Sequence, residues 1–117
     1  MAEYQHKDLA AGRWATMTFA EQMGNIGSEV SRSLKNQNRP ERFRGAFTRA
    51  LELFDLSIEA NRGYSGRLKE LCRAREEFCD YFMGNSFGTN PVQMQRYYDH
   101  FISLNSDHLS PSIHINQ

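Results

Sequence analysis

The histidines are the side chains best suited to metal or acid–base chemistry, and their positions argue against a metal centre. Dinuclear centres in helical bundles take a Glu-x-x-His pair from each of two helices, since that spacing directs both ligands inward. This sequence lacks two such pairs, because its one Glu-x-x-His, Glu3 and His6, lies in the polar first residues. The other histidines are His100, His108 and His114, towards the end of the chain. The sequence predicts no metal site and no cofactor.

The two cysteines, Cys72 and Cys79, lie seven residues apart within one apolar segment. On a helix this spacing corresponds to about 10 Å of rise. A disulfide needs Cα atoms within about 7 Å, so the two cannot form a disulfide with each other. They have no Cys or His partner at zinc-site spacing. We expect both to be free thiols that pack as small apolar groups in a reducing, cytoplasmic setting.

Sequence motifs for catalysis are also missing. The glycines are scattered and form no phosphate-binding loop. No serine or cysteine stands in a strained-turn signature of a nucleophile. A triad dispersed along the chain would leave no local signature, so an enzyme stays as the third hypothesis, behind two that need no catalysis. We predict that the protein is not an enzyme.

Basic residues gather in the middle of the chain, although the formal net charge is zero. Between Arg32 and Arg75 the net charge is +6, whereas the segments on either side are acidic. We expect nucleic-acid binding from the residues that begin the second and third helices: Arg39, Arg42, Arg44, Arg49, Arg67, Lys69 and Arg73. In an antiparallel helix pair these two groups lie at opposite ends, which would give a stripe and not one patch. The alternative is a solvated face with local pairs such as Arg73 and Glu77.

A second set of residues predicts contacts between subunits. Arg75 interrupts an apolar stripe, so it must reach solvent, pair with an acid such as Glu29, Glu52 or Asp55, or project at a subunit interface. Two glycines in the first helix suggest close approach of a neighbouring helix, and two tyrosines in the fourth are expected to be exposed. The predicted interface residues are Gly24, Gly27, Arg75, Tyr97 and Tyr98.

The elements that would position these residues are four amphipathic helices. Apolar residues recur at helical spacing from Phe19 to Leu34, Pro40 to Ile58, Leu68 to Phe82 and Pro91 to Leu104. Thr18 with Glu21 forms a capping box, Pro40 suits a first turn, and Asn90 suits an N-cap. The predicted fold is all-α, an up-and-down antiparallel four-helix bundle, with its second helix the most buried. It comprises an N-terminal arm (1–17) carrying Trp14, the bundle (18–105) and a flexible tail (106–117).

No stretch approaches the roughly 20 apolar residues that would span a bilayer, and the first residues lack the pattern of a signal peptide. A cytoplasmic protein without a membrane partner is therefore expected.

Four segments resemble a group of small bacterial proteins: HKDLAAGRW, EQMGNIGSEVSRSL, AFTRALELFDLSI and RLKELCRAREEFCDYF. The resemblance covers residues 6 to about 104. That group is similar to the four-helix-bundle proteins that include 23S rRNA intervening-sequence proteins and the accessory protein of diversity-generating retroelements. The resemblance implies a ring-forming homo-oligomer, such as a pentamer, whose basic surface binds RNA or a reverse transcriptase. It implies no catalytic residues.

Two hypotheses for function therefore lead. The first is a non-enzymatic accessory or scaffold protein that binds structured RNA or DNA, or a nucleic-acid enzyme such as a reverse transcriptase. The second is a protein-interaction or self-assembly module without nucleic acid.

Overall fold

The computed structural model describes residues 12–109, and within that range the chain is helical without β-strands. A short turn of helix at residues 12–15 is followed by α2 (Phe19–Lys35), α3 (Pro40–Ala60), α4 (Ser65–Phe82) and α5 (Pro91–Leu109). The predicted all-α class is confirmed. No helix in this part of the chain is long and apolar enough to cross a membrane.

The helix boundaries follow from local capping. The Thr18 hydroxyl accepts the Glu21 backbone N–H, and the Glu21 carboxylate accepts the Thr18 N–H, which confirms the capping box. Pro40 occupies the first turn of α3. The Asn90 side-chain oxygen accepts the backbone N–H groups of Val92 and Gln93 and so caps α5. These boundaries are set by a few residues and needed no tertiary contact to be predicted.

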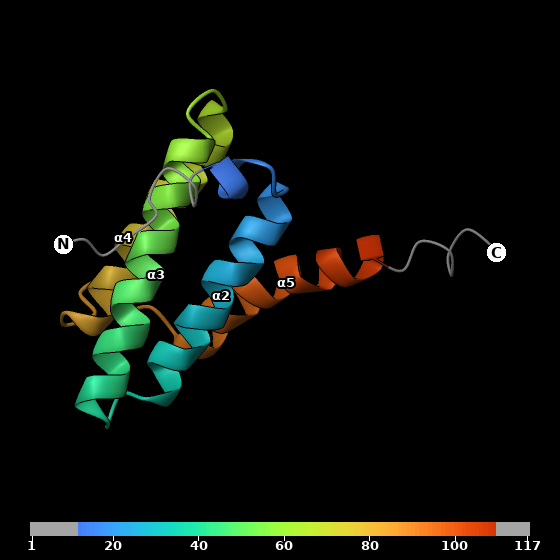
Figure 1. Cartoon of the computed structure of the whole chain (residues 1–117). Helices are drawn as coiled ribbons and strands as arrows, with labels where there is room; N and C mark the ends of the chain where they lie inside the picture. Colours follow the sequence, from blue (N-terminus) through green and yellow to red (C-terminus); the bar gives the residue numbers. More distant parts are fainter. Residues whose placement is uncertain (1–11, 110–117) are drawn as a thin grey trace.

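The core lies where α2 packs along α3 on one side and along α5 on the other (Figure 1). The sequence predicts α3 as the most buried helix, but α2 buries more residues, because α2 packs closely along both α3 and α5 whereas α3 contacts α4 less extensively. Fully buried side chains from four helices meet there: Met23, Ile26, Val30, Phe54, Leu71, Phe78 and Tyr98. A run of phenylalanine rings, Phe43, Phe47, Phe78 and Phe82, joins α3 to α4.

The side of the molecule between α4 and α5 is more open than the sides between α2 and α3, α2 and α5, and α3 and α4. Helix α5 packs along α2, and in Figure 1 its C-terminal half points away from α3 and α4. It meets α4 through side chains such as Tyr97, which contacts Glu70. A groove separates the two helices there. The predicted up-and-down bundle therefore stays a prediction, because α4 and α5 do not pack along each other as the other neighbours do.

The two ends of the chain differ from their predicted roles in detail. Residues 1–11 and 110–117, with Glu3, His6 and His114, lie outside the described residues, and of residues 106–109 only the helical backbone is described. Those four residues belong to α5, whereas the prediction placed them in the tail, and residues 110–117 of that tail lie outside the described residues. Trp14 lies against the helices as expected, since its indole is buried and donates a hydrogen bond to the Ser57 hydroxyl at 2.7 Å.

Candidate nucleic-acid interface

The first three turns of α3 carry the densest group of arginines. Arg39 lies at the N-cap, and Arg42, Arg44 and Arg49 follow within the helix. All four side chains are exposed. This region is helical because Pro40 starts it and because Ala46, Phe47 and Ala50 turn an apolar side to the core. The arginines lie on the remaining sides, where they face solvent.

These four arginines keep their charges available. Among the side chains of residues 12–105, none of them forms an ion pair. Their outward side is hollowed at Gly45, where a shallow depression is lined by Arg44, Arg49, Thr48 and the carboxylates Glu41 and Glu52. We call Arg39, Arg42, Arg44 and Arg49 the α3 basic surface. Exposed guanidinium groups such as these can bind phosphate or carboxylate oxygens through two parallel hydrogen bonds.

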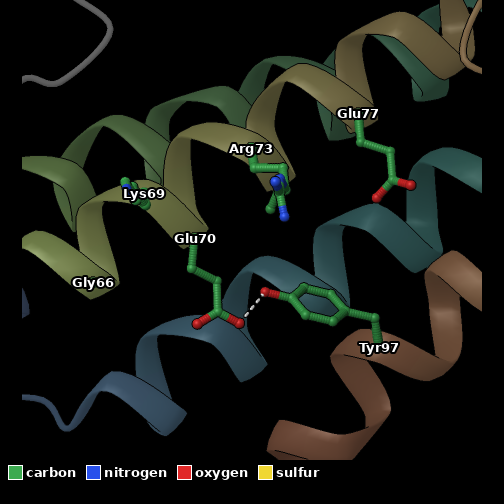
Figure 2. A pocket seen from close by; sticks show the side chains of 7 residues that line it. Gly66, Lys69, Glu70, Arg73, Glu77 and Tyr97 are labelled. Carbon is green, nitrogen blue, oxygen red and sulfur yellow. Dashed lines mark hydrogen bonds between the residues drawn. The ribbon is translucent and has the colours of Figure 1, made fainter.

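The basic residues of α4 have a different environment. Lys69 and Arg73 line the groove between α4 and α5, which has a volume of about 650 Å³. Figure 2 shows that Glu70 and Glu77 project from the same helix beside them, with Tyr97 facing Glu70 from α5. The groove is therefore mixed in charge, as is the depression at Gly45 on α3.

Tyr97 lines this groove from α5 and is joined to α4 by a hydrogen bond. Its hydroxyl donates to the Glu70 carboxylate at 2.5 Å (Figure 2). Burial, reinforced by the neighbouring Glu70 carboxylate, raises the pKa of Tyr97 well above its usual range. The phenol therefore stays protonated and acts as a donor, which suits a structural contact and not a general base.

Arg67 is held by contacts within the molecule. Its guanidinium stacks over the rings of Tyr64, at 4.4 Å from the centroid, and Phe19, at 5.4 Å. It also donates a hydrogen bond of 3.4 Å to the Asn61 side-chain oxygen. These contacts join α2, α3 and α4 at one end of the molecule, so Arg67 is less free to bind a ligand than the arginines of α3.

The structure therefore divides the seven predicted nucleic-acid residues into two groups. The start of α3 lies beside the end of α4, as the contact between Phe43 and Phe82 shows. The start of α4 lies beside the end of α3, where Arg67 contacts Asn61. The two groups are thus at opposite ends, as antiparallel packing predicts, and they do not merge into one patch. The predicted local ion pair between Arg73 and Glu77 is not formed in the described structure.

Four of the five residues predicted to lie between subunits, Gly24, Gly27, Tyr97 and Tyr98, contact other helices of the same chain instead. A Cβ added at Gly27 would come within 2.5 Å of Tyr98 Cβ, and one added at Gly24 within 2.9 Å of Asn105 Nδ2. The two glycines thus admit α5 of the same chain. The expected exposure of the tyrosines is wrong, because Tyr98 is 1% exposed and Tyr97 is half-buried. Both rings pack against the core, which their helical spacing from Phe101 and Met94 already allowed.

Arg75 pairs with one of the three acids that were considered. Its Nε donates to the Asp55 carboxylate at 3.1 Å, and both side chains remain partly exposed. The pair links α4 to α3 and explains how an arginine is tolerated beside an apolar stripe. It favours a structural role for Arg75 over a place at a subunit interface.

A buried polar network was not predicted from the sequence. The Asn61 amide donates to the Gln22 side-chain oxygen at 2.8 Å and to the Ser57 carbonyl at 2.7 Å. The Gln22 amide in turn donates to the Trp14 carbonyl at 3.0 Å. The network fastens the residues before α2 to α2 and α3. The sequence did indicate that Gln22 and Ser57 are buried, because both fall next to the apolar stripes of their helices. Their hydrogen-bond partners could not be predicted from spacing.

A second unpredicted feature is the loop between α4 and α5. The Asp80 carboxylate accepts hydrogen bonds from the Ser86 N–H and hydroxyl and from the Phe87 N–H. These bonds lower the pKa of Asp80, the Ser86 hydroxyl contributing most. Gly84, Asn85 and Gly88 adopt positive φ angles that complete the turn. The loop is thereby fixed, and it presents Phe87 to solvent with 63% of the residue exposed.

Within the part of the chain that the structure describes, no group of three or more His, Cys, Asp or Glu side chains could hold a metal ion. Both cysteines are free thiols, with Cys72 exposed and Cys79 partly buried.

Comparisons with protein-family models, curated proteins and solved structures find no match to this chain. The resemblance to the intervening-sequence and retroelement accessory proteins therefore remains a prediction.

Proposed function

We propose that this protein is a non-enzymatic accessory or scaffold protein that binds structured RNA or DNA through the α3 basic surface. The observation that supports this proposal most directly is the set of exposed guanidinium groups at Arg39, Arg42, Arg44 and Arg49, none with an ion pair among the described residues. In this proposal the helices form an up-and-down antiparallel four-helix bundle that holds the surface rigid. Lys69 and Arg73 lie in the separate groove between α4 and α5 and are not part of this surface.

Phosphate binding follows from the kind of charge presented. Arginine is always protonated, and its planar group matches phosphate oxygens in two parallel hydrogen bonds. Each phosphate contact releases counterions, so affinity for duplex DNA falls with salt with a slope of about −0.9 per contact. Four arginines in contact would give a slope between about −3 and −4. The proposal thus predicts strong salt dependence and little dependence on sequence.

The test is a fluorescence-anisotropy titration of labelled duplex RNA, duplex DNA and hairpin RNA at several salt concentrations. Replacing Arg42 and Arg49 with alanine should weaken binding and reduce the salt slope by about 2. The matched control replaces Arg13 and Arg62, two exposed arginines at the other end of the molecule, and should change the slope little. The proposal fails if the wild-type protein binds none of these probes at low salt, or if both pairs of replacements act equally.

A protein-interaction or self-assembly module without nucleic acid is the alternative. The fixed loop after α4 supports it, because the loop exposes Phe87 and the residue that follows α4, Met83, is 70% exposed. Exposed aromatic and methionine side chains on rigid backbone are typical of protein-binding surfaces. A reverse transcriptase is the protein partner that the sequence resemblance suggests. Binding to a purified reverse transcriptase that persists in the Arg42 and Arg49 double variant would favour this alternative.

A further inference from the structure

The outward side of α4 carries a regular stripe of residues. Its members follow one another at steps of three, four, three, four and three residues: Gly66, Lys69, Arg73, Glu76, Asp80 and Met83. This is the spacing of a coiled-coil seam, but here charged side chains occupy four of the six positions, and Met83 is the C-cap residue that follows α4. Asp80 is partly exposed, and the other five are exposed. We call these six residues the α4 stripe.

The order of charges along the α4 stripe is unfavourable for a single helix. Lys69 and Arg73 lie in the N-terminal half of α4, and Glu76 and Asp80 lie in the C-terminal half. Lys69 stands four residues before Arg73, and Glu76 four before Asp80, so like charges are neighbours on the surface within each half. Only Arg73 and Glu76, three residues apart, are neighbours of opposite charge along the stripe.

Neighbouring helices of the same chain do not offset this order. On the side of α4 that faces α3, Arg75 pairs with Asp55. On the side that faces α5, Glu70 accepts a hydrogen bond from Tyr97. The α4 stripe lies between these two sides, and its first three residues, Gly66, Lys69 and Arg73, also line the edge of the groove towards α5. Among the side chains of residues 12–105, Lys69, Arg73 and Glu76 form no ion pair.

A second copy of the same stripe, running in the opposite direction, has the complementary order. When residue 73 of one copy faces residue 76 of the other, residue 69 faces residue 80 and residue 66 faces residue 83. Arg73 then meets Glu76, and Lys69 meets Asp80, each twice because of the two-fold symmetry. Lys69 would share the Asp80 carboxylate with the Ser86 and Phe87 groups that already bind it. We infer that this protein forms a two-fold symmetric homodimer through antiparallel pairing of the α4 stripe.

The ends of the stripe supply the apolar contacts that such a pairing needs. Met83 would face Gly66 of the second copy, where no side chain occupies the space. Tyr64, with 55% of the residue exposed, lies at the N-terminal end of α4, and Phe87 lies in the loop that follows its C-terminal end. Antiparallel pairing brings the Phe87 end of one copy to the Tyr64 end of the other. Three of the large apolar residues exposed by the described chain thus lie at the two ends of α4.

Charge reversal tests this pairing by sedimentation velocity and light scattering over a range of protein concentrations. The wild-type protein should show a concentration-dependent dimer. Arg73→Glu alone and Glu76→Arg alone each place like charges opposite one another, twice, and should weaken the dimer by about tenfold or more. The double variant Arg73→Glu/Glu76→Arg restores opposite charges and should dimerise about as well as the wild type. A mixture of the two single variants should form a heterodimer.

Two further measurements complete the test. Met83→Ala should weaken the dimer, whereas Val92→Ala, a control at an exposed residue outside the stripe, should not. Circular dichroism at each concentration verifies that the variants stay folded. The inference is overturned if the wild type is a monomer at its highest soluble concentration, or if the double variant is as weak as the single ones. A parallel pairing would be revealed by the wild type binding Arg73→Glu better than it binds itself.

This inference does not depend on nucleic-acid binding. The residues of the α3 basic surface lie outside the α4 stripe, so the Arg42 and Arg49 variants should leave dimerisation unchanged. If the Arg42 and Arg49 variants lose RNA binding and remain dimeric, both the proposed function and the dimer are supported. If the wild-type protein is a monomer that binds RNA, the dimer alone is overturned.

Discussion

Replacing Gly27 with alanine should destabilise the fold, although alanine is the better helix former. The added Cβ would lie 2.5 Å from Tyr98 Cβ and 3.2 Å from Tyr98 Cγ. Ordinary contact between carbon atoms is about 3.5 to 4.0 Å. The Cβ of Tyr98 is bonded directly to the backbone of α5, and Tyr98 is buried, so no side-chain rotation can relieve the overlap. Helices α2 and α5 would have to move apart by about 1 Å.

The expected magnitude combines two opposing terms. Overpacking a well-packed interior costs about 1–3 kcal/mol, and separating two helices should lie at the upper end of that range. Replacing glycine by alanine within a helix recovers about 1 kcal/mol. The net destabilisation should therefore be about 1–2 kcal/mol for Gly27→Ala. Gly24→Ala should be milder, because the nearest atom is the Asn105 amide nitrogen, at the end of a side chain that can move.

Gly45 provides the matched control. It lies within α3, and a Cβ added there would meet no other atom within 4 Å. Gly45→Ala should therefore stabilise the fold by up to about 1 kcal/mol. Urea unfolding followed by circular dichroism gives the three free energies, with comparable m-values required. If Gly27→Ala were as stable as the wild type while Gly45→Ala behaved as expected, the close approach of α2 and α5 would be refuted.

Three further predictions concern polar groups. Asn61→Ala should lower the free energy of unfolding by about 2–3 kcal/mol, since the buried Gln22 oxygen loses its donor, whereas Asn38→Ala in an exposed turn should change it little; equal effects in urea titrations would contradict the buried network. Asp80→Asn should destabilise the fold at pH values above 3.8: hydrogen bonds lower the folded-state pKa of Asp80 from that ordinary value, so its stabilising contribution is fully present above 3.8 and is lost as the pH falls through the lower folded-state pKa. Thermal melts from pH 2 to 7 should therefore show the two proteins converging at low pH, and a constant difference would count against the carboxylate bonds. Cys72 should react with a thiol reagent well before Cys79, because burial raises the pKa of the Cys79 thiol and limits access, and mass spectrometry of the labelled protein would show the order.

The sequence by itself determined the secondary structure to within a few residues. Thr18 with Glu21, Pro40 and Asn90 mark helix starts through local hydrogen bonds and backbone preference, which operate within one turn of chain. The apolar stripes identified the sides that face the core for the same reason, since a helix turns every 3.6 residues whatever surrounds it. The separation of the basic residues into two ends also followed, because it needs only that α3 and α4 be antiparallel.

The tertiary structure decided which neighbour each side chain meets. Gly24 and Gly27 indicated close approach, but only the packing of α5 along α2 showed that the approaching helix belongs to the same chain. Tyr97 and Tyr98 are adjacent in sequence, and a rotation of about 100° between them decides which is fully buried. The partner of Arg75 was one of three acids until the register of α3 against α4 selected Asp55. Register and rotation between helices depend on contacts between residues far apart in sequence, so local patterns cannot determine them.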